Sequence, residues 1–261
     1  MAGTRWLARL EAMNAILDQW EALQLHFEMA ASNERSHTAR VLNDAYKDPQ
    51  NKLYMLYVRK VLKEVVRVNK MFQAENADIT KLTEELLSMY RNLMQLVVEP
   101  RYLSKCTLES LLNFKYVDYL IPICAVQFGY DFSVAAAKAP LNNVQITYVK
   151  ERCVKFVVDL LREVQLRLPD NINTLLMMKQ LHSFTATSQC KEQIEDIASK
   201  YQFTFADMDQ FESEWNALGF EQWPKSCLSN TISFWAEVKA GLAGSTGSRN
   251  FQCAATSVAD H

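Results

Sequence analysis

The apolar residues of this chain recur at alternating steps of three and four residues, the spacing of one face of an α-helix. The pattern is longest in two consecutive stretches, residues 53–72 and 77–98, joined by a short connection. A short connection between helices favours antiparallel packing, so these stretches predict a helical hairpin. Pro100 has no amide hydrogen to donate and is expected to close the second helix. The stripes are Tyr54, Val58, Val61, Val65, Val68 and Phe72 in the first helix, and Ile79, Leu82, Leu86, Met89, Leu93 and Leu96 in the second.

Most of the remaining chain has the same character. Only six glycines and six prolines occur among the 261 residues, and this shortage of turn-forming residues agrees with a mostly helical protein. Residues 144–149 resemble a strand, but the apolar stripe that follows favours a helix through to 168. Between residues 108 and 132, Pro122 and Gly129 divide an apolar, aromatic stretch into short buried pieces. Further helices are predicted within 36–46, 171–184, 190–201, 207–219 and 228–242.

A first helix is predicted from the stripe Met13, Ile16, Trp20, Leu23, Phe27 and Ala30. Trp20, Trp215 and Trp235 stand in apolar helical stripes and are expected in the core. The predicted fold class is therefore all-α, a multi-helix bundle with an antiparallel helical hairpin. We expect an amino-terminal part over residues 1–100, a carboxy-terminal helical part of the same domain over 101–240, and a flexible tail over 241–261.

Composition excludes several classes of protein. The formal charge of −2 argues against a strongly basic nucleic-acid coat but allows a local basic stripe. Six cysteines occur without any C-x-x-C pair, so no zinc knuckle or redox motif is indicated. The longest apolar run, residues 119–128, is much shorter than the roughly 20 residues that cross a bilayer. No secretory signal is recognisable at the start, so we expect an intracellular protein with reduced thiols and no membrane partner.

The chain begins its first helix with Thr4-Arg5-Trp6, and the segments LYMLYVRKVL, NKMFQ, LRLPDNINTLL, ESEWNAL and FWAEV follow in that order. This ordered set resembles transposases of the hobo/Activator/Tam3 (hAT) superfamily over most of the chain. In that family a large helical insertion interrupts an RNase H-like core. The core supplies three carboxylates that hold divalent metal ions for DNA strand cleavage and transfer.

The resemblance implies that this chain is the helical insertion region without the catalytic carboxylates. We therefore expect no catalytic residue, no metal ligand and no cofactor here, with Mg²⁺ or Mn²⁺ needed only by a full-length parent. Residues 241–261 would be the truncated start of the carboxy-terminal core region. The resemblance also implies a nuclear location and DNA contacts from Arg5 and Trp6. The alternative for Trp6 is simple packing at the start of the first helix.

The residues themselves suggest one further DNA contact. Arg59, Lys60, Lys63, Arg67 and Lys70 form a basic stripe beside the apolar face of one predicted helix, which could follow a row of phosphates. Glu64 interrupts the stripe, and a solvated helix face is the simpler interpretation.

Two other features carry no chemistry of their own. The acidic cluster Asp207, Asp209, Glu212 and Glu214 fits the start of a helix better than a metal site, because no glycine-containing calcium loop accompanies it. His182 has no second histidine at metal-ligand spacing.

Three functions follow from these observations. The first is a non-catalytic fragment or domesticated derivative of a hAT transposase that binds DNA or a protein, with self-association through exposed apolar residues and no small-molecule substrate. The second is a truncated form of an active transposase that performs metal-dependent strand cleavage and transfer. The third is a helical scaffold that binds partners along a groove.

Overall fold

The computed structural model describes residues 4–33, 36–74, 78–106, 111, 115–168, 179–191, 195, 199 and 208–244. Over these residues the protein is all-α, with twelve α-helices, two short 3-10 helices and no strand, which confirms the predicted all-α class. The chain divides into two compact units. Unit 1 comprises residues 1–74 and 86–169, and unit 2 comprises residues 75–85 and 170–261.

Unit 1 contains helices α1 (Thr4–Asp18), α2 (Trp20–Asn33), α3 (His37–Lys47), α4 (Pro49–Phe72), α6 (Pro100–Leu103), α8 (Tyr130–Lys138) and α9 (Asn143–Arg167), with 3-10 turns η1 (Tyr116–Tyr119) and η2 (Ile123–Ala125). Unit 2 contains α11 (Ser183–Ala186), α13 (Met208–Ala217), α14 (Lys225–Leu228) and α15 (Thr231–Gly244). Helix α5 (Ile79–Gln95) contributes residues 79–85 to unit 2 and the rest to unit 1.

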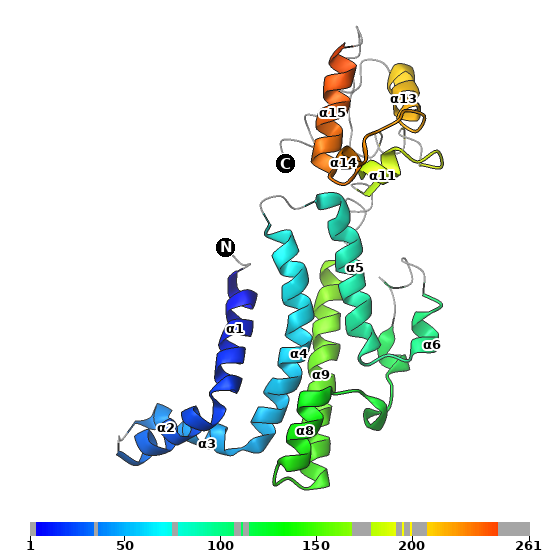
Figure 1. Ribbon diagram of the computed structural model, residues 1–261. Helices are drawn as coiled ribbons and strands as arrows, with labels where there is room; N and C mark the ends of the chain where they lie inside the picture. Colours follow the sequence, from blue (N-terminus) through cyan, green and yellow to red (C-terminus); the bar gives the residue numbers. More distant parts are fainter. Residues whose placement is uncertain are drawn as a thin grey trace. The chain divides into compact units, whose positions relative to one another are not determined.

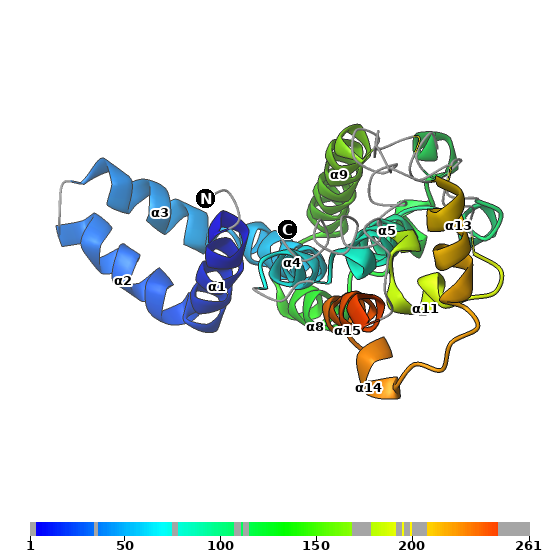
Figure 2. The same cartoon turned by 90° about the horizontal axis from the view of Figure 1, so that it is seen from above.

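Helix α4 is the centre of unit 1. Its start is set by Asp48, whose carboxylate accepts a hydrogen bond from the Gln50 amide at 2.9 Å, and by Pro49 at the first helical position. Helices α1, α8 and α9 all pack against it (Figure 2). Because neighbours cover several sides, α4 buries more than the one predicted stripe. Its buried residues are Leu53, Tyr57, Val58, Val61, Leu62, Val66 and Val68, whereas Phe72 of the stripe is exposed.

The predicted first helix is divided in two. It breaks at Gln19, which separates α1 from α2 without a proline or glycine. The two halves have different partners, since α1 packs on α4 and α2 packs on α3. Trp20, at the break, is buried with its ring centroid 4.7 Å from that of Tyr46 on α3. Packing against two differently placed helices therefore overrides the continuous apolar stripe.

Helix α9 confirms the prediction that residues 144–149 belong to a helix and not to a strand. It begins with a capping box, in which the Gln145 amide donates to the Asn142 side chain at 2.9 Å and the Asn142 amide donates to the Gln145 side chain at 3.0 Å. Val149, Cys153, Val157 and Leu161 then form its fully buried stripe, in the spacing of a helix.

Helix α5 runs in the direction opposite to α4 (Figure 1). The Asn92 amide group on α5 donates to the Glu64 carboxylate on α4 at 2.9 Å. The helix ends at Gln95, five residues before Pro100, and Pro100 instead begins α6. Between them residues 96 and 97 form a turn, Val98 forms an isolated antiparallel bridge with Leu120, and the Ile121 amide donates to the Val97 carbonyl at 2.9 Å. The prediction that Pro100 ends the second helix of the hairpin was therefore wrong. The helix ends earlier, where the chain turns and residues 97–98 pair with residues 120–121.

Unit 2 has an aromatic core. Trp215 on α13 and Trp235 on α15 are 1% and 2% exposed, and their rings lie parallel with centroids 6.4 Å apart. The prediction that Trp20, Trp215 and Trp235 lie in the core is confirmed. Most of the residues of the helices predicted within 171–184 and 190–201 lie outside the described residues, as does the tail beyond Gly244.

Candidate functional site

Arg5 and Trp6 lie in the first turn of α1, and their side chains fall outside the described part of the structure. Asp207 also lies outside it. Their predicted roles stay predictions.

The five cations of the predicted basic stripe all lie on α4, but they are not equivalent. The Arg59 side chain is only 16% exposed; one of its terminal nitrogens pairs with Asp131 at 2.9 Å and the other lies 3.9 Å from Asp18. Arg67 binds Glu64 at 3.0 Å. These two arginines already have carboxylate partners, so they are poor candidates for phosphate contacts.

The three lysines of the stripe differ from one another. Lys63 and Lys70 are exposed, with no ion pair to any described residue. Lys60 differs from them, because its ammonium group donates to the Gln127 carbonyl at 3.0 Å. Lys60 thereby lies at the edge of a groove that the sequence pattern did not indicate.

This groove in unit 1 has a volume of about 930 Å³. We call it the Lys60–Arg91 groove, after the two basic residues that line it. None of its described lining residues is acidic. Its other lining residues are Asn92, Gln95, Leu96, Val98, Pro100, Leu103, Ser104, Cys106, Ile121, Ala125 and Gln127.

Lys60 is held in position by the loop that precedes α8. Gly129 has φ +99°, and a Cβ atom there would lie 3.2 Å from the Lys60 Cδ. Only glycine allows both this backbone conformation and the close approach of the lysine stem. Burial lowers the pKa of Lys60. The hydrogen bond to Gln127 therefore pre-orients the Lys60 ammonium group, which can attract an incoming anion.

Arg91 supplies the second charge from α5. It is exposed and has no ion pair to a described residue. The carboxylate of Glu64 accepts hydrogen bonds from Asn92 and from Arg67. The bond from Arg67, with that from Asn92, lowers the pKa of Glu64 despite its partial burial, so this carboxylate is ionised but already paired. The groove can thus bind an anion through Lys60 and Arg91 and an apolar or planar group along its aliphatic lining.

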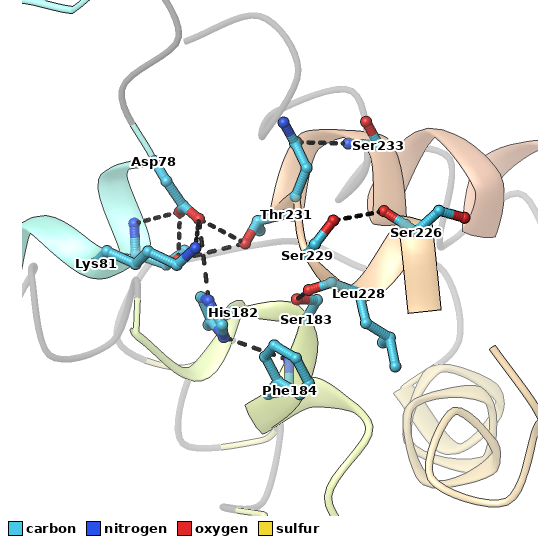
Figure 3. A network of polar contacts seen from close by, with 12 residues as sticks. Asp78, Lys81, His182, Ser183, Phe184, Ser226, Leu228, Ser229, Thr231 and Ser233 are labelled. Atoms are coloured by element: carbon cyan, nitrogen blue, oxygen red, sulfur yellow. Dashed lines mark hydrogen bonds and ion pairs between the residues drawn. The ribbon is translucent and has the colours of Figure 1, made fainter. Parts of the chain in front are cut away.

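A second polar cluster lies in unit 2, around Asp78 (Figure 3). The Asp78 carboxylate accepts hydrogen bonds from the Thr80 amide at 3.2 Å and the Thr231 hydroxyl at 3.1 Å, and it pairs with Lys81 at 3.4 Å. Burial raises the pKa of Asp78, but these donors, with His182, outweigh burial and leave the pKa below its ordinary value. Asp78 therefore joins the start of α5 to the start of α15.

His182 caps the short helix α11 in the same cluster. Its Nδ1 accepts from the Phe184 amide at 3.3 Å, and its Nε2 lies 3.9 Å from the Asp78 carboxylate. Burial lowers the pKa of His182. The neighbouring Ser183 hydroxyl donates to the Leu228 carbonyl at 2.6 Å, so it is not poised as a nucleophile with this histidine. The cluster is best explained as a structural junction.

The acidic cluster of α13 gives no sign of metal binding in the part that is described. Asp209 is exposed at the start of the helix, whereas Glu212 and Glu214 are half-buried. Among the described residues no three His, Cys, Asp or Glu side chains are grouped closely enough to hold a metal ion. In the same part of the chain, no helix is both long and apolar enough to cross a membrane.

Comparison with known proteins gives no assignment: no protein-family model, curated protein or solved structure matches the chain. The sequence pattern found Lys60 but missed Arg91 and Gln127. For Gln127 the only signal in the sequence was its proximity to Gly129, one of the chain's few glycines. For Arg91 the sequence offered no signal.

Proposed function

We propose that the chain is a non-catalytic nucleic-acid-binding module, derived from the helical insertion region of a hAT-type transposase and acting in the nucleus. The observation that carries the proposal is the Lys60–Arg91 groove, whose lining among the described residues includes two basic residues and no acidic one. Nucleic acids present regularly spaced phosphates beside planar apolar bases, and the groove offers complementary cations and aliphatic walls.

The proposed interaction is weak and depends on salt. Lys60 and Arg91 supply two phosphate contacts. In a plot of the logarithm of the binding constant against the logarithm of the salt concentration, two contacts give a slope of about −1.8 for duplex DNA and about −1.4 for a single strand. The net charge of −2 adds no general attraction for DNA. Binding therefore depends on these two local cations.

Fluorescence anisotropy with a labelled 20-nucleotide DNA, in single-stranded and duplex form, tests the proposal between 50 and 200 mM NaCl. The double variant Lys60→Gln/Arg91→Gln should weaken binding about ten-fold or more. Lys63→Gln/Lys70→Gln removes the same charge from the exposed face of α4 and serves as the matched control, with an expected change below about two-fold. Equal losses in both variants would assign binding to general charge, and absence of binding by the unaltered protein would refute the proposal.

Self-association is a second proposal, carried by exposed apolar side chains on α2 and α3. Leu25, Met29 and Val41 are 59%, 57% and 51% exposed. Removing such side chains from water favours association. Light scattering after size exclusion should show concentration-dependent mass, reduced by Leu25→Ser/Met29→Ser. A monomer at all concentrations would contradict this.

The active-transposase alternative would require strand transfer with Mg²⁺ or Mn²⁺, and the scaffold alternative would require capture of a partner by the chain without DNA.

A further inference from the structure

Helices α4 and α9 hold an arginine between two tyrosine rings. The Arg152 guanidinium carbon on α9 lies 4.6 Å from the ring centroid of Tyr54 on α4 and 5.9 Å from that of Tyr148, one turn earlier on α9. Tyr54 is in turn fixed by Phe156, which meets it edge-on with centroids 6.4 Å apart. The guanidinium plane is thus positioned by aromatic contacts rather than by a carboxylate.

The Arg152 side chain is half-buried, so part of it is open to a ligand. Arg152 forms no ion pair with a described residue, and Asp159, two turns further along α9, is already paired with Lys155 at 2.8 Å. Tyr148 is 55% exposed, so it presents ring surface to solvent beside the arginine. An unpaired planar cation and an exposed aromatic ring therefore lie side by side.

We propose that Tyr148 and Arg152 bind one unpaired nucleotide of a single-stranded nucleic acid. The base stacks on the Tyr148 ring, and the phosphate accepts hydrogen bonds from the guanidinium fork of Arg152. Bases in a duplex are stacked on one another and cannot reach such a ring, so single strands are preferred. The inference rests on the proposed function, because that function names nucleic acid as the partner. The residues that bind the nucleotide are different from those of the Lys60–Arg91 groove.

The test compares two fluorescein-labelled probes that differ only in their bases, a twelve-nucleotide thymidine strand and an abasic strand of equal length. Both carry the same phosphates, so the ratio of their affinities reports the contribution of the bases, and the Tyr148 variant assigns that contribution to stacking on its ring. The unaltered protein should bind the thymidine strand about ten-fold more tightly, the effect of one stacked base. Tyr148→Leu should abolish this preference and leave abasic binding unchanged, whereas Arg152→Gln should weaken both.

Tyr130→Leu is the matched control, because Tyr130 is an 82% exposed tyrosine on α8. It should keep the preference for thymidine. If Tyr148→Leu also keeps it, the stacking site is refuted. If the unaltered protein binds both strands equally and Lys60→Gln/Arg91→Gln weakens both, the proposed function stands and this inference fails. Binding of neither strand by the folded protein refutes both.

Discussion

Replacing Gly129 by alanine tests whether the loop before α8 positions Lys60. Gly129 has φ +99° and ψ 164°, a conformation essentially restricted to glycine. Forcing an alanine into such a conformation costs about 1–3 kcal/mol. The new Cβ would also lie 3.2 Å from the Lys60 Cδ, so the flexible lysine stem would have to move. Because that stem shifts easily, we assign most of the cost to the backbone.

The expected loss can be read from urea unfolding followed by circular dichroism at 222 nm. With a slope of about 2 kcal/mol per molar urea, a loss of about 2 kcal/mol lowers the midpoint by roughly 1 M. Gly219→Ala is the control, because Gly219 lies outside the left-handed region and its Cβ would meet only carbonyl oxygens at 3.4 Å or more. The control should change stability by less than about 0.5 kcal/mol.

The same variant links stability to binding. Moving the Lys60 stem should displace its ammonium group from the Gln127 carbonyl and weaken DNA binding several-fold under conditions where the protein is still folded. An unchanged urea midpoint would refute the conformational argument at Gly129. A lowered midpoint with unchanged DNA affinity would show that the position of Lys60 does not matter for binding.

Three further predictions concern buried polar groups. Tyr57→Phe should raise the free energy of unfolding by about 1 kcal/mol, because the fully buried Tyr57 hydroxyl has no hydrogen-bond partner among the described residues. A lower urea midpoint would contradict this prediction. Burial lowers the pKa of His182, so the unfolded chain takes up the proton first and stability should fall as pH decreases through about 6.5. His182→Asn keeps a good helix cap and should reduce that decrease between pH 7.5 and 5.5, whereas an identical pH dependence would refute the assignment. Burial raises the pKa of Cys153 to about 12. At pH 8 a thiol reagent should therefore label the exposed Cys124 and leave Cys153 unmodified until the chain unfolds, which peptide mass mapping would measure.

The sequence alone determined the helical class and much of the core. Helical periodicity is a local property, because residues three or four apart share a face whatever the rest of the chain does. The positions of α4, α9, α13 and α15 and the burial of Trp215 and Trp235 follow from it. The same local rule could not locate the break at Gln19, where contacts with α3 and α4 decide the path of the chain.

Only the tertiary structure decided which cations are available to a ligand. Arg59 is paired by Asp131, 72 residues away, and Lys60 is oriented by Gln127, 67 residues away. Neither contact has a periodic signature, because both depend on the way α8 and its preceding loop pack on α4. A stripe of five similar charges in the sequence thus becomes paired arginines, two exposed lysines and one lysine fixed at a groove, since charge is a property of a residue and its availability is a property of the fold.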